Sequence, residues 1–152
     1  KLIAEVVDSF KLELKRRKMN VIIEENDGDD GEIRSDKSLL QLILENVISN
    51  AIKYGREGTT FRIGVVMNQS ALTVSIVISD DGIGIPENQQ SQIFTKMFRA
   101  TNAKASDTDG NGLGLYISHI AAETIGAKLT FESHEDRGTT FTIKLPIRNK
   151  RT

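Results

Sequence analysis

SLLQLILENVISNAIKYG, residues 38–55, decides the fold, because it predicts a long helix with one apolar side and one polar side of unusual composition. Ser35 and Asp36 stand where a helix N-cap belongs, and Gly55 ends the run where a C-terminal cap belongs. Apolar residues recur at helical spacing and predict a buried stripe: Leu40, Leu44, Val47, Ile48 and Ala51. The helix should therefore pack against the rest of the chain along that stripe.

The opposite side of this helix carries Asn46, Asn50, Lys53 and Tyr54, whose spacing stacks them on one helical face. Asparagine is a poor helix former, so two asparagines one turn apart call for a reason. Carboxamide oxygens suit a Mg²⁺ ion that keeps several waters and shares phosphates, and Lys53 would add a positive charge. A solvated polar face is the alternative, and for Lys53 alone it is the simpler interpretation.

The rest of the chain predicts helices and strands in mixed order. Helices are expected over residues 2–17, near 88–94, and from the glycine-rich run at 110–114 to Thr124, with Gly126 as the cap. Strands are expected over residues 19–25, 60–67, 72–79, 128–133 and 139–145. Most strands come as hairpins, which favours one α+β sandwich, a largely antiparallel sheet with helices on one face.

Two loops stand out in this pattern. The acidic turn NDGDDG, residues 26–31, lacks the spaced ligands and the closing Glu of a calcium-binding EF-hand, so a plain turn is the preferred interpretation. Residues 100–110, ATNAKASDTDG, are small and polar without apolar anchors, and we expect them to be mobile.

The totals exclude several classes of protein. The 152 residues suffice for a single domain, and a net charge of −1 gives no global field for nucleic acid. The absence of cysteine excludes disulfides, thiolate zinc sites and a cysteine nucleophile. No apolar run is long enough to span a bilayer, and no signal peptide opens the chain. Because the chain starts abruptly on a charged amphipathic segment, we expect it to be a fragment of a larger protein.

The run DDGIGIP, residues 80–86, follows a strand of alternating apolar residues. A carboxylate at the strand end, Asp80, can accept a hydrogen bond from the exocyclic amine of adenine, whereas guanine presents an acceptor there. Gly82 and Gly84 would let the backbone pass close under a flat ring. The alternative is a strand followed by an ordinary glycine-rich turn.

Two further stretches surround the mobile loop. In GNGLGL, residues 110–115, glycines precede a helix whose free N–H groups could meet phosphates, although the spacing fits neither a Rossmann nor a Walker A motif. Phe94 and Phe98 lie one helical turn apart in IFTKMFRA. They could form a hinge for the loop, with Arg99 or Lys96 reaching a terminal phosphate, or they could be two core aromatics beside a surface arginine.

Taken in order, these blocks resemble the catalytic and ATP-binding domain of sensor histidine kinases, whose N, G1, F, G2 and G3 boxes they match. The resemblance runs from the first strand to Pro146. It implies a two-layer α/β sandwich of the Bergerat type, with a mostly antiparallel sheet of about five strands and about three helices on one face. It also implies that ATP and Mg²⁺ are the cofactors.

The resemblance assigns a role to each matched position. Asn50, with Asn46, would hold Mg²⁺ and phosphates; Asp80 would take the adenine amino group; residues 100–109 would form the ATP lid. Asn46, Lys53 and Arg99 would act in catalysis. The full set of implied nucleotide-binding residues is Asn46, Asn50, Lys53, Tyr54, Asp80, Gly82, Gly84, Ile85, Phe98, Arg99, Gly110, Asn111, Gly112, Leu113, Gly114, Leu115 and Thr140.

The chain departs from the family pattern at two places. Asp81 stands where the family often has Asn, which we take to be tolerated. The G3 box often has Gly-x-Gly before the threonine, and only Gly138 is matched here, which weakens the local argument for that loop.

One position separates kinase from hydrolase. Related ATPases, such as Hsp90-like chaperones and gyrase-type topoisomerases, carry a Glu general base where this chain has Asn46, and Glu45 lies about 100° round the helix. A carboxamide cannot take a proton from water, so the γ-phosphate should be kept for a protein nucleophile. The family's acceptor is a histidine on a separate N-terminal helical hairpin. His119 and His134 are not expected to serve, because neither lies on such a hairpin.

The resemblance therefore implies the ATP-binding part of an autophosphorylating protein-histidine kinase. Its implied partners are its own dimerisation and phosphoacceptor domain and a response-regulator receiver domain, with no nucleic acid. The intact protein would be a homodimer and the isolated domain a monomer. The domain would be cytoplasmic, and a membrane anchor elsewhere in the protein stays open. The alternatives are a degenerate nucleotide-binding signalling module, or another ATPase or serine kinase of the same superfamily.

Overall fold

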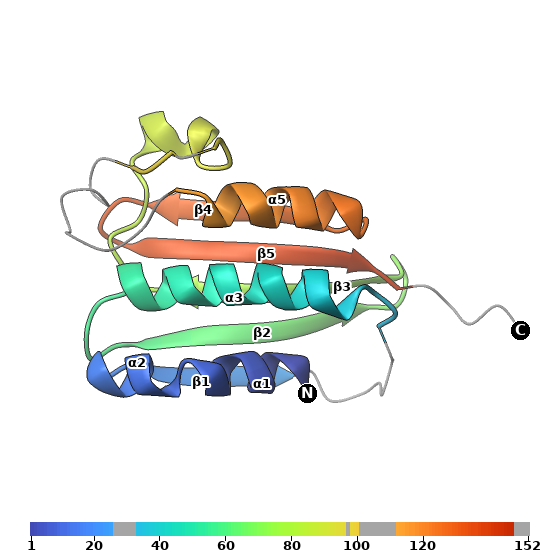
Figure 1. Ribbon diagram of the computed structural model, residues 1–152, viewed down its shortest axis with the longest axis horizontal. Coiled ribbons are helices and arrows are strands. Elements are labelled where there is room, and N and C mark those ends of the chain that lie inside the picture. The colour runs from blue at the N-terminus through green and yellow to red at the C-terminus, as the bar shows by residue number, and fades with distance from the viewer. Residues whose placement is uncertain (26–32, 97, 101–111, 148–152) are drawn as a thin grey trace, which may run out of the picture.

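Five strands form one sheet, and helices cover one of its faces (Figure 1). The computed structural model describes residues 1–25, 33–96, 98–100 and 112–147. The strands are β1 (Asn20–Glu25), β2 (Thr60–Asn68), β3 (Thr73–Asp80), β4 (Lys128–His134) and β5 (Gly138–Pro146). Their order in the sheet is β1-β2-β3-β5-β4; β1 pairs with β2 in parallel and every other pair is antiparallel. The predicted α+β sandwich with a mostly antiparallel five-stranded sheet is confirmed.

Alternation along β3 and β5 decides which residues face the helices. In β3, Val74, Ile76 and Ile78 are buried, and the same parity brings Asp80 to the buried side at the strand's end. In β5 the buried side carries Thr139, Phe141, Ile143 and Leu145. The polar residue that ends β3 is therefore placed under the helices and not in solvent.

The helix α3 (Lys37–Tyr54) lies across the middle of the sheet (Figure 1). On one side of it lie α1 (Leu2–Ser9) and α2 (Lys11–Arg16), and on the other lies α5 (Gly114–Thr124). The side chain of Asp36 caps α3 by accepting a hydrogen bond from the Leu39 N–H at 3.0 Å, as the sequence predicted. The core lies between α3 and the sheet. Its fully buried side chains include Ile43, Leu44, Val47, Ile48, Phe61, Ile63, Ile78 and Ile143.

The end of α3 differs from the sequence-based prediction in its physical cause. Gly55 has φ −66° and ψ 158°, which is extended and not left-handed. A side chain is excluded by lack of space, since a Cβ there would lie 2.7 Å from the Met19 Cε and nearer still to the Ala51 carbonyl. The Arg17 guanidinium donates to the carbonyls of Lys53 at 3.2 Å and of Gly55 at 2.5 Å, and so satisfies the helix C-terminus.

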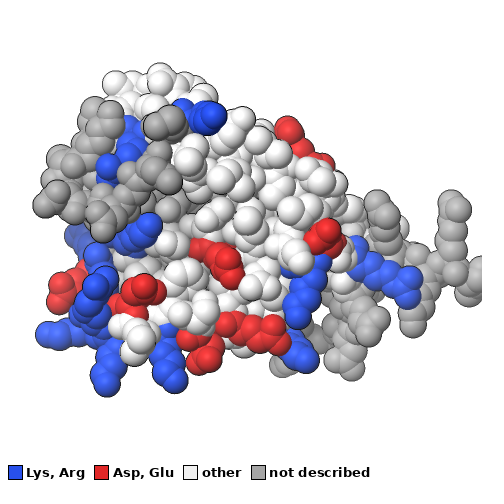
Figure 2. All heavy atoms as spheres, in the orientation of Figure 1, with Lys and Arg blue, Asp and Glu red and all other residues white. Residues whose placement is uncertain are grey.

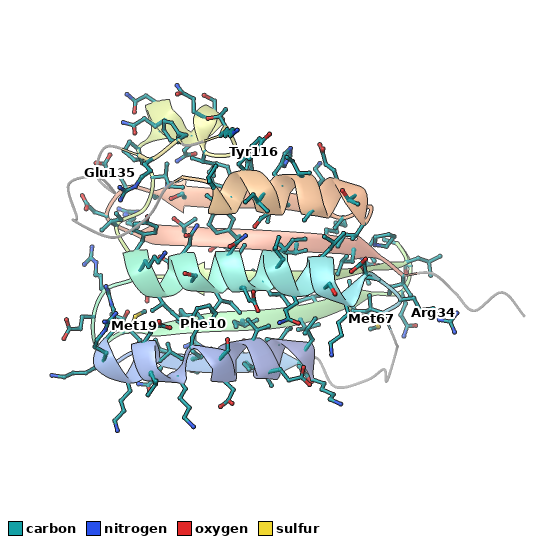
Figure 3. The ribbon with its side chains drawn as sticks, in the orientation of Figure 1. Phe10, Met19, Arg34, Met67, Tyr116 and Glu135 are labelled. Carbon is teal, nitrogen blue, oxygen red and sulfur yellow. The ribbon has the colours of Figure 1, made fainter. Side chains whose placement is uncertain are left out.

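The single helix predicted over residues 2–17 is wrong in one respect. The structure has two helices, α1 (Leu2–Ser9) and α2 (Lys11–Arg16), which break at Phe10 (φ −98°, ψ 8°). The apolar spacing continues through the break, so sequence periodicity could not reveal it. Figure 3 shows Phe10 and Met19 between these helices and α3, and both pack against the core.

One short element remains among the described residues. Residues Glu87–Gln92 form a 3₁₀ helix, η1, where an α-helix near 88–94 was predicted. None of the helices in the described ranges combines the length and the apolar character that crossing a bilayer requires. The acidic turn at 26–31 and most of the predicted lid, 101–109, lie outside the described residues.

Candidate functional site

A pocket of about 230 Å³ lies between the polar face of α3, the end of β3 and the start of α5. The α3 side is formed by Asn46, Ser49, Asn50, Lys53 and Tyr54. The structure therefore brings together the four residues that the sequence placed on one face, and adds Ser49. Figure 2 shows Lys and Arg side chains, with Asp and Glu among them, at the end of the molecule where α2 and α3 end. Lys53 and Arg99 line the pocket itself and give it positive charge for an anionic ligand.

Asn46 is hydrogen-bonded through its side chain to a distant part of the chain. Its Nδ2 donates to the Gly114 carbonyl at 3.1 Å and to the Ser118 hydroxyl at 2.9 Å, both on α5. The neighbouring Glu45 accepts a hydrogen bond from Gln41 Nε2 at 2.8 Å and does not line the pocket. Asn46 thus brings an amide, and not a carboxylate, to this side of the pocket, and its role in separating transfer from hydrolysis stays a prediction.

Asp80, the last residue of β3, also lines the pocket, and it is only 9% exposed. Burial raises the pKa of this carboxyl to about 6, opposed by hydrogen bonds from the backbone N–H groups of Gly82 and Thr139, while the nearby Asp81 charge raises the pKa further. The Gly82 N–H donates to Oδ1 at 2.8 Å. Above pH 6 the group is a buried carboxylate, which can only accept hydrogen bonds, and so it favours a ligand with an amino group.

The backbone after Asp80 is held in place from two sides. The Ile83 N–H donates to the Tyr54 carbonyl at 3.1 Å, and the Ile83 carbonyl accepts from the Asp136 N–H at 2.8 Å. A Cβ on Gly82 would lie 2.7 Å from Asp80 Oδ1 and would collide with the Tyr54 carbonyl. Gly82 thus serves the site by leaving room for Asp80 and is not itself among the residues lining the pocket, which include Ile83, Gly84 and Ile85.

A cluster of hydroxyls supports this loop from the β4–β5 hairpin. Ser133 Oγ accepts from the Ile85 N–H at 2.8 Å, donates to the Gly138 carbonyl at 3.1 Å and lies 2.8 Å from Thr139 Oγ1. Thr139 also lines the pocket. Sequence reasoning missed both Ser133 and Thr139, together with the lining residues Ser49, Ile83, Ile93, Ala100 and Phe141.

The prediction that Thr140 contacts the nucleotide is corrected. Thr140 lies on the opposite side of β5 from Thr139 and Phe141, and its hydroxyl is 2.8 Å from the hydroxyl of Ser79 on β3. The sequence Gly-Thr-Thr-Phe contained the signal needed to choose between the two threonines. Phe141, Ile143 and Leu145 share the parity of Thr139, so the apolar alternation of β5 places Thr139 on the inner face.

The two phenylalanines of the F-box stretch have different environments. Phe98 and Arg99 line the pocket, as predicted. Phe94 does not; its ring stacks on His119 of α5 with centroids 5.0 Å apart and meets Phe131 edge-on at 5.7 Å. Phe94 thus fits the core interpretation, and the hinge interpretation of the pair stays a prediction.

The glycine-rich run is only partly described. Gly112, Gly114 and Leu115 line the pocket at the start of α5, whereas Leu113 is not among the lining residues. Gly110 and Asn111 lie outside the described residues.

The donor set can be tested against the implied Mg²⁺. Across the described part of the chain, no group of three or more His, Asp or Glu is placed to hold a metal ion. Asn46 and Asn50 offer two neutral carboxamides on one side of the pocket. Neutral oxygens fit an ion that arrives with its phosphates and waters, and they would be too few for a free metal.

Comparison with known proteins agrees with this geometry. The family model described as "Histidine kinase-, DNA gyrase B-, and HSP90-like ATPase" matches residues 35–149. Over 106 residues the chain is 41% identical to the histidine protein kinase SaeS of Staphylococcus aureus (strain USA300). The matched stretch covers 70% of this chain and 30% of SaeS. The chain thus spans less than a third of the length of this relative.

Solved structures of histidine kinases share the fold. The nucleotide-free catalytic domain of the histidine kinase ThkA is 27% identical with a TM-score of 0.79, covering 96% of this chain and 90% of that one. Full-length ShkA, solved in complex with AMPPNP, has a TM-score of 0.82 at 20% identity, covers 99% of this chain and 30% of that one, and supports the fold alone. The chain therefore belongs to the histidine kinase-, DNA gyrase B- and HSP90-like ATPase family, as a catalytic ATP-binding domain of the sensor histidine kinase type.

Proposed function

We propose that this chain binds ATP with Mg²⁺ and delivers the γ-phosphoryl group to a histidine on a separate helical domain of the same protein. The observation that carries the proposal is the polarity of the pocket. The lining combines the buried carboxylate of Asp80 with the amide of Asn50 and the positive charges of Lys53 and Arg99. This arrangement suits a ligand with an amino group at one end and phosphates at the other.

The adenine end would recognise its ligand through Asp80. An ionised carboxylate accepts a hydrogen bond from the 6-amino group of adenine and repels the 6-oxo group of guanine. Ile83, Ile85 and Phe141 supply apolar surface for the base, and Gly84 lets the backbone approach it. Ligand specificity would thus rest on one buried charge within an apolar cleft.

The phosphate end would be held by Asn50 and Asn46 through their carboxamides, with Lys53 and Arg99 adding positive charge. A Mg²⁺ ion bound there would neutralise the developing negative charge on the transferred group. The bond from the γ-phosphorus to the bridging β–γ oxygen breaks, and a bond forms to a ring nitrogen of the acceptor imidazole, which ends one proton poorer. ADP is the leaving group.

Transfer is favoured over hydrolysis by the absence of a base for water. Among the described lining residues Asp80 is the one carboxylate, and the Gly82 and Thr139 backbones engage it at the adenine end. The histidines of this chain are poor acceptors. His119 packs on Phe94 and lies 3.3 Å from Glu123, and His134 ends β4.

The further assignments follow from the same proposal. The acceptor would belong to the protein's own dimerisation domain, and a response-regulator receiver domain would take the phosphoryl group next. The intact protein would be a homodimer, this domain alone a monomer on the cytoplasmic side, and any membrane anchor would lie outside this chain. The length of SaeS relative to the matched segment leaves room for such domains.

The proposal is tested with Asp80→Asn in the intact protein and in this chain. We expect the substitution to abolish measurable ATP binding by calorimetry, and with it the acid-labile phosphoprotein that wild type forms from ATP labelled at the γ-position. Ser79→Ala is the matched control, because it removes a polar group from the outer face of the same strand. Unchanged ATP affinity in Asp80→Asn, or labelling that survives acid, would contradict the proposal.

A further inference from the structure

The carboxamide of Asn46 is held by α5 in one orientation. The Gly114 carbonyl can only accept a hydrogen bond, so the Asn46 atom 3.1 Å from it must be the NH₂ group. The same nitrogen donates to Ser118 Oγ at 2.9 Å. Rotating the amide by 180° would set Oδ1 against the Gly114 carbonyl, and two acceptors would then face each other. With both N–H groups engaged by α5, the oxygen is the atom that Asn46 has left for a ligand in the pocket.

Ser118 is an unusual residue for its position. It lies one turn after Gly114 on α5, is 0% exposed, and belongs to a helix whose other buried residues are alanines, Ala121 and Ala122. A buried hydroxyl needs a partner, and this one is bonded to Asn46, which is 72 residues away in sequence. It does not line the pocket, so it can affect a ligand only through Asn46.

We propose that Ser118 is a positioning residue that fixes the Asn46 carboxamide, so that Oδ1 would be presented to the Mg²⁺ ion that accompanies the phosphates of the nucleotide. The inference rests on the proposed function and deepens it. One acceptor, the Gly114 carbonyl, leaves the amide free to turn about a single hydrogen bond. The second acceptor, Ser118, removes that freedom before the ligand arrives, which lowers the ordering cost of binding.

Gly114 fits the same arrangement. A Cβ there would lie 3.6 Å from both Cγ and Oδ1 of Asn46, which is ordinary contact without a clash. A side chain at Gly114 would thus cover the oxygen that Ser118 helps to orient. The first turn of α5 both directs the amide and leaves its oxygen uncovered.

The test measures binding of AMPPNP to this 152-residue chain by calorimetry, once with Mg²⁺ and once with a chelator. For Ser118→Ala we expect affinity in chelator to be unchanged and the Mg²⁺-dependent gain to fall about fivefold, the worth of one neutral hydrogen bond. Thr124→Ala is the matched control. It removes a hydroxyl from the exposed far end of the same helix, where Oγ1 donates to the Ile120 carbonyl at 2.9 Å.

A double-mutant cycle with Asn46→Ala decides whether Ser118 acts through Asn46. We expect Ser118→Ala to have no further effect on the Mg²⁺-dependent gain in the Asn46→Ala background. If Ser118→Ala does not fold, Ser118→Thr and Ser118→Val replace it, since they match in volume and differ in the hydroxyl. Thr should then keep the gain that Val loses.

Three results would each overturn the inference. Ser118→Ala could leave the Mg²⁺-dependent gain in affinity unchanged, or it could lower affinity equally with and without Mg²⁺. The third is that the effects of the two substitutions are additive in the cycle. The wild-type chain separates this from the proposed function. If wild type binds AMPPNP with a Mg²⁺-dependent gain and the Ser118 variants match it, only the positioning role fails. If wild type does not bind AMPPNP, the proposed function itself fails.

Discussion

Asp80 shows how a single residue can serve ligand binding at the expense of stability. Its folded pKa of about 6 exceeds the ordinary 3.8, because burial disfavours the charge more than the two backbone N–H groups favour it. Between these two values the folded chain holds a proton that the unfolded chain has lost, so stability falls as pH rises through that range. The full loss, about 3 kcal/mol at most, is reached above pH 6. Without a ligand, the pocket thus contains a buried carboxylate that lowers stability.

Asp80→Asn should therefore remove a pH dependence. We expect the free energy of unfolding of wild type to fall relative to that of the variant between pH 4 and about 6.5, and the difference to be constant above. Urea unfolding of both proteins across this range measures it. Asp81→Asn, which removes the adjacent exposed carboxylate, should keep the wild-type fall and shift it to slightly lower pH. Parallel curves for wild type and Asp80→Asn would show that burial does not raise this pKa.

At the scale of elements, the site depends on a loop clamped between α3 and the β4–β5 hairpin. Gly84 has φ +66°, and a Cβ there would lie 2.7 Å from the carbonyl carbon of His134, with the carbonyl oxygen nearer still. Gly58 has a similar φ of +78°, but nothing lies within 4 Å of its Cβ position. The two glycines share one conformational demand and differ in their surroundings.

This difference predicts unequal costs for the same substitution. Gly58→Ala should lower the free energy of unfolding by about 1 kcal/mol, the cost of a left-handed alanine. Gly84→Ala should cost about 3 kcal/mol or more, because the hairpin backbone must also move. Chemical denaturation of each variant measures this, and nucleotide affinity should fall in Gly84→Ala alone. Equal losses of stability would mean that the loop and the hairpin are not packed as described.

At the scale of the whole molecule, sequence patterns predicted what is periodic or locally ordered. The alternation of β3 and β5, the α3 stripe with its Asp36 cap, and the order of the boxes led to the fold and to most of the pocket. Contacts between distant segments were beyond that reasoning, as with Ser118 on Asn46 and Ser133 on Ile85. The helix break at Phe10 was also hidden, because the apolar period runs through it. Thr139 could have been found from strand parity.

The molecule as a whole predicts slow hydrolysis by this chain alone. A general base contributes about 100- to 10,000-fold, and Asn46 occupies its place while Glu45 is engaged by Gln41. We expect phosphate release from ATP at least about 100-fold below the 1 s⁻¹ that marks a slow ordinary enzyme. A phosphate-release assay on this chain, with Asp80→Asn as the blank, measures the rate.

Hydrolysis needs a base, whereas transfer to an imidazole lone pair does not. The intact protein should therefore form its phosphoprotein faster than this chain releases phosphate. Release near 1 s⁻¹ that is lost in Asp80→Asn would show that this pocket activates water, and would make the chain a hydrolase.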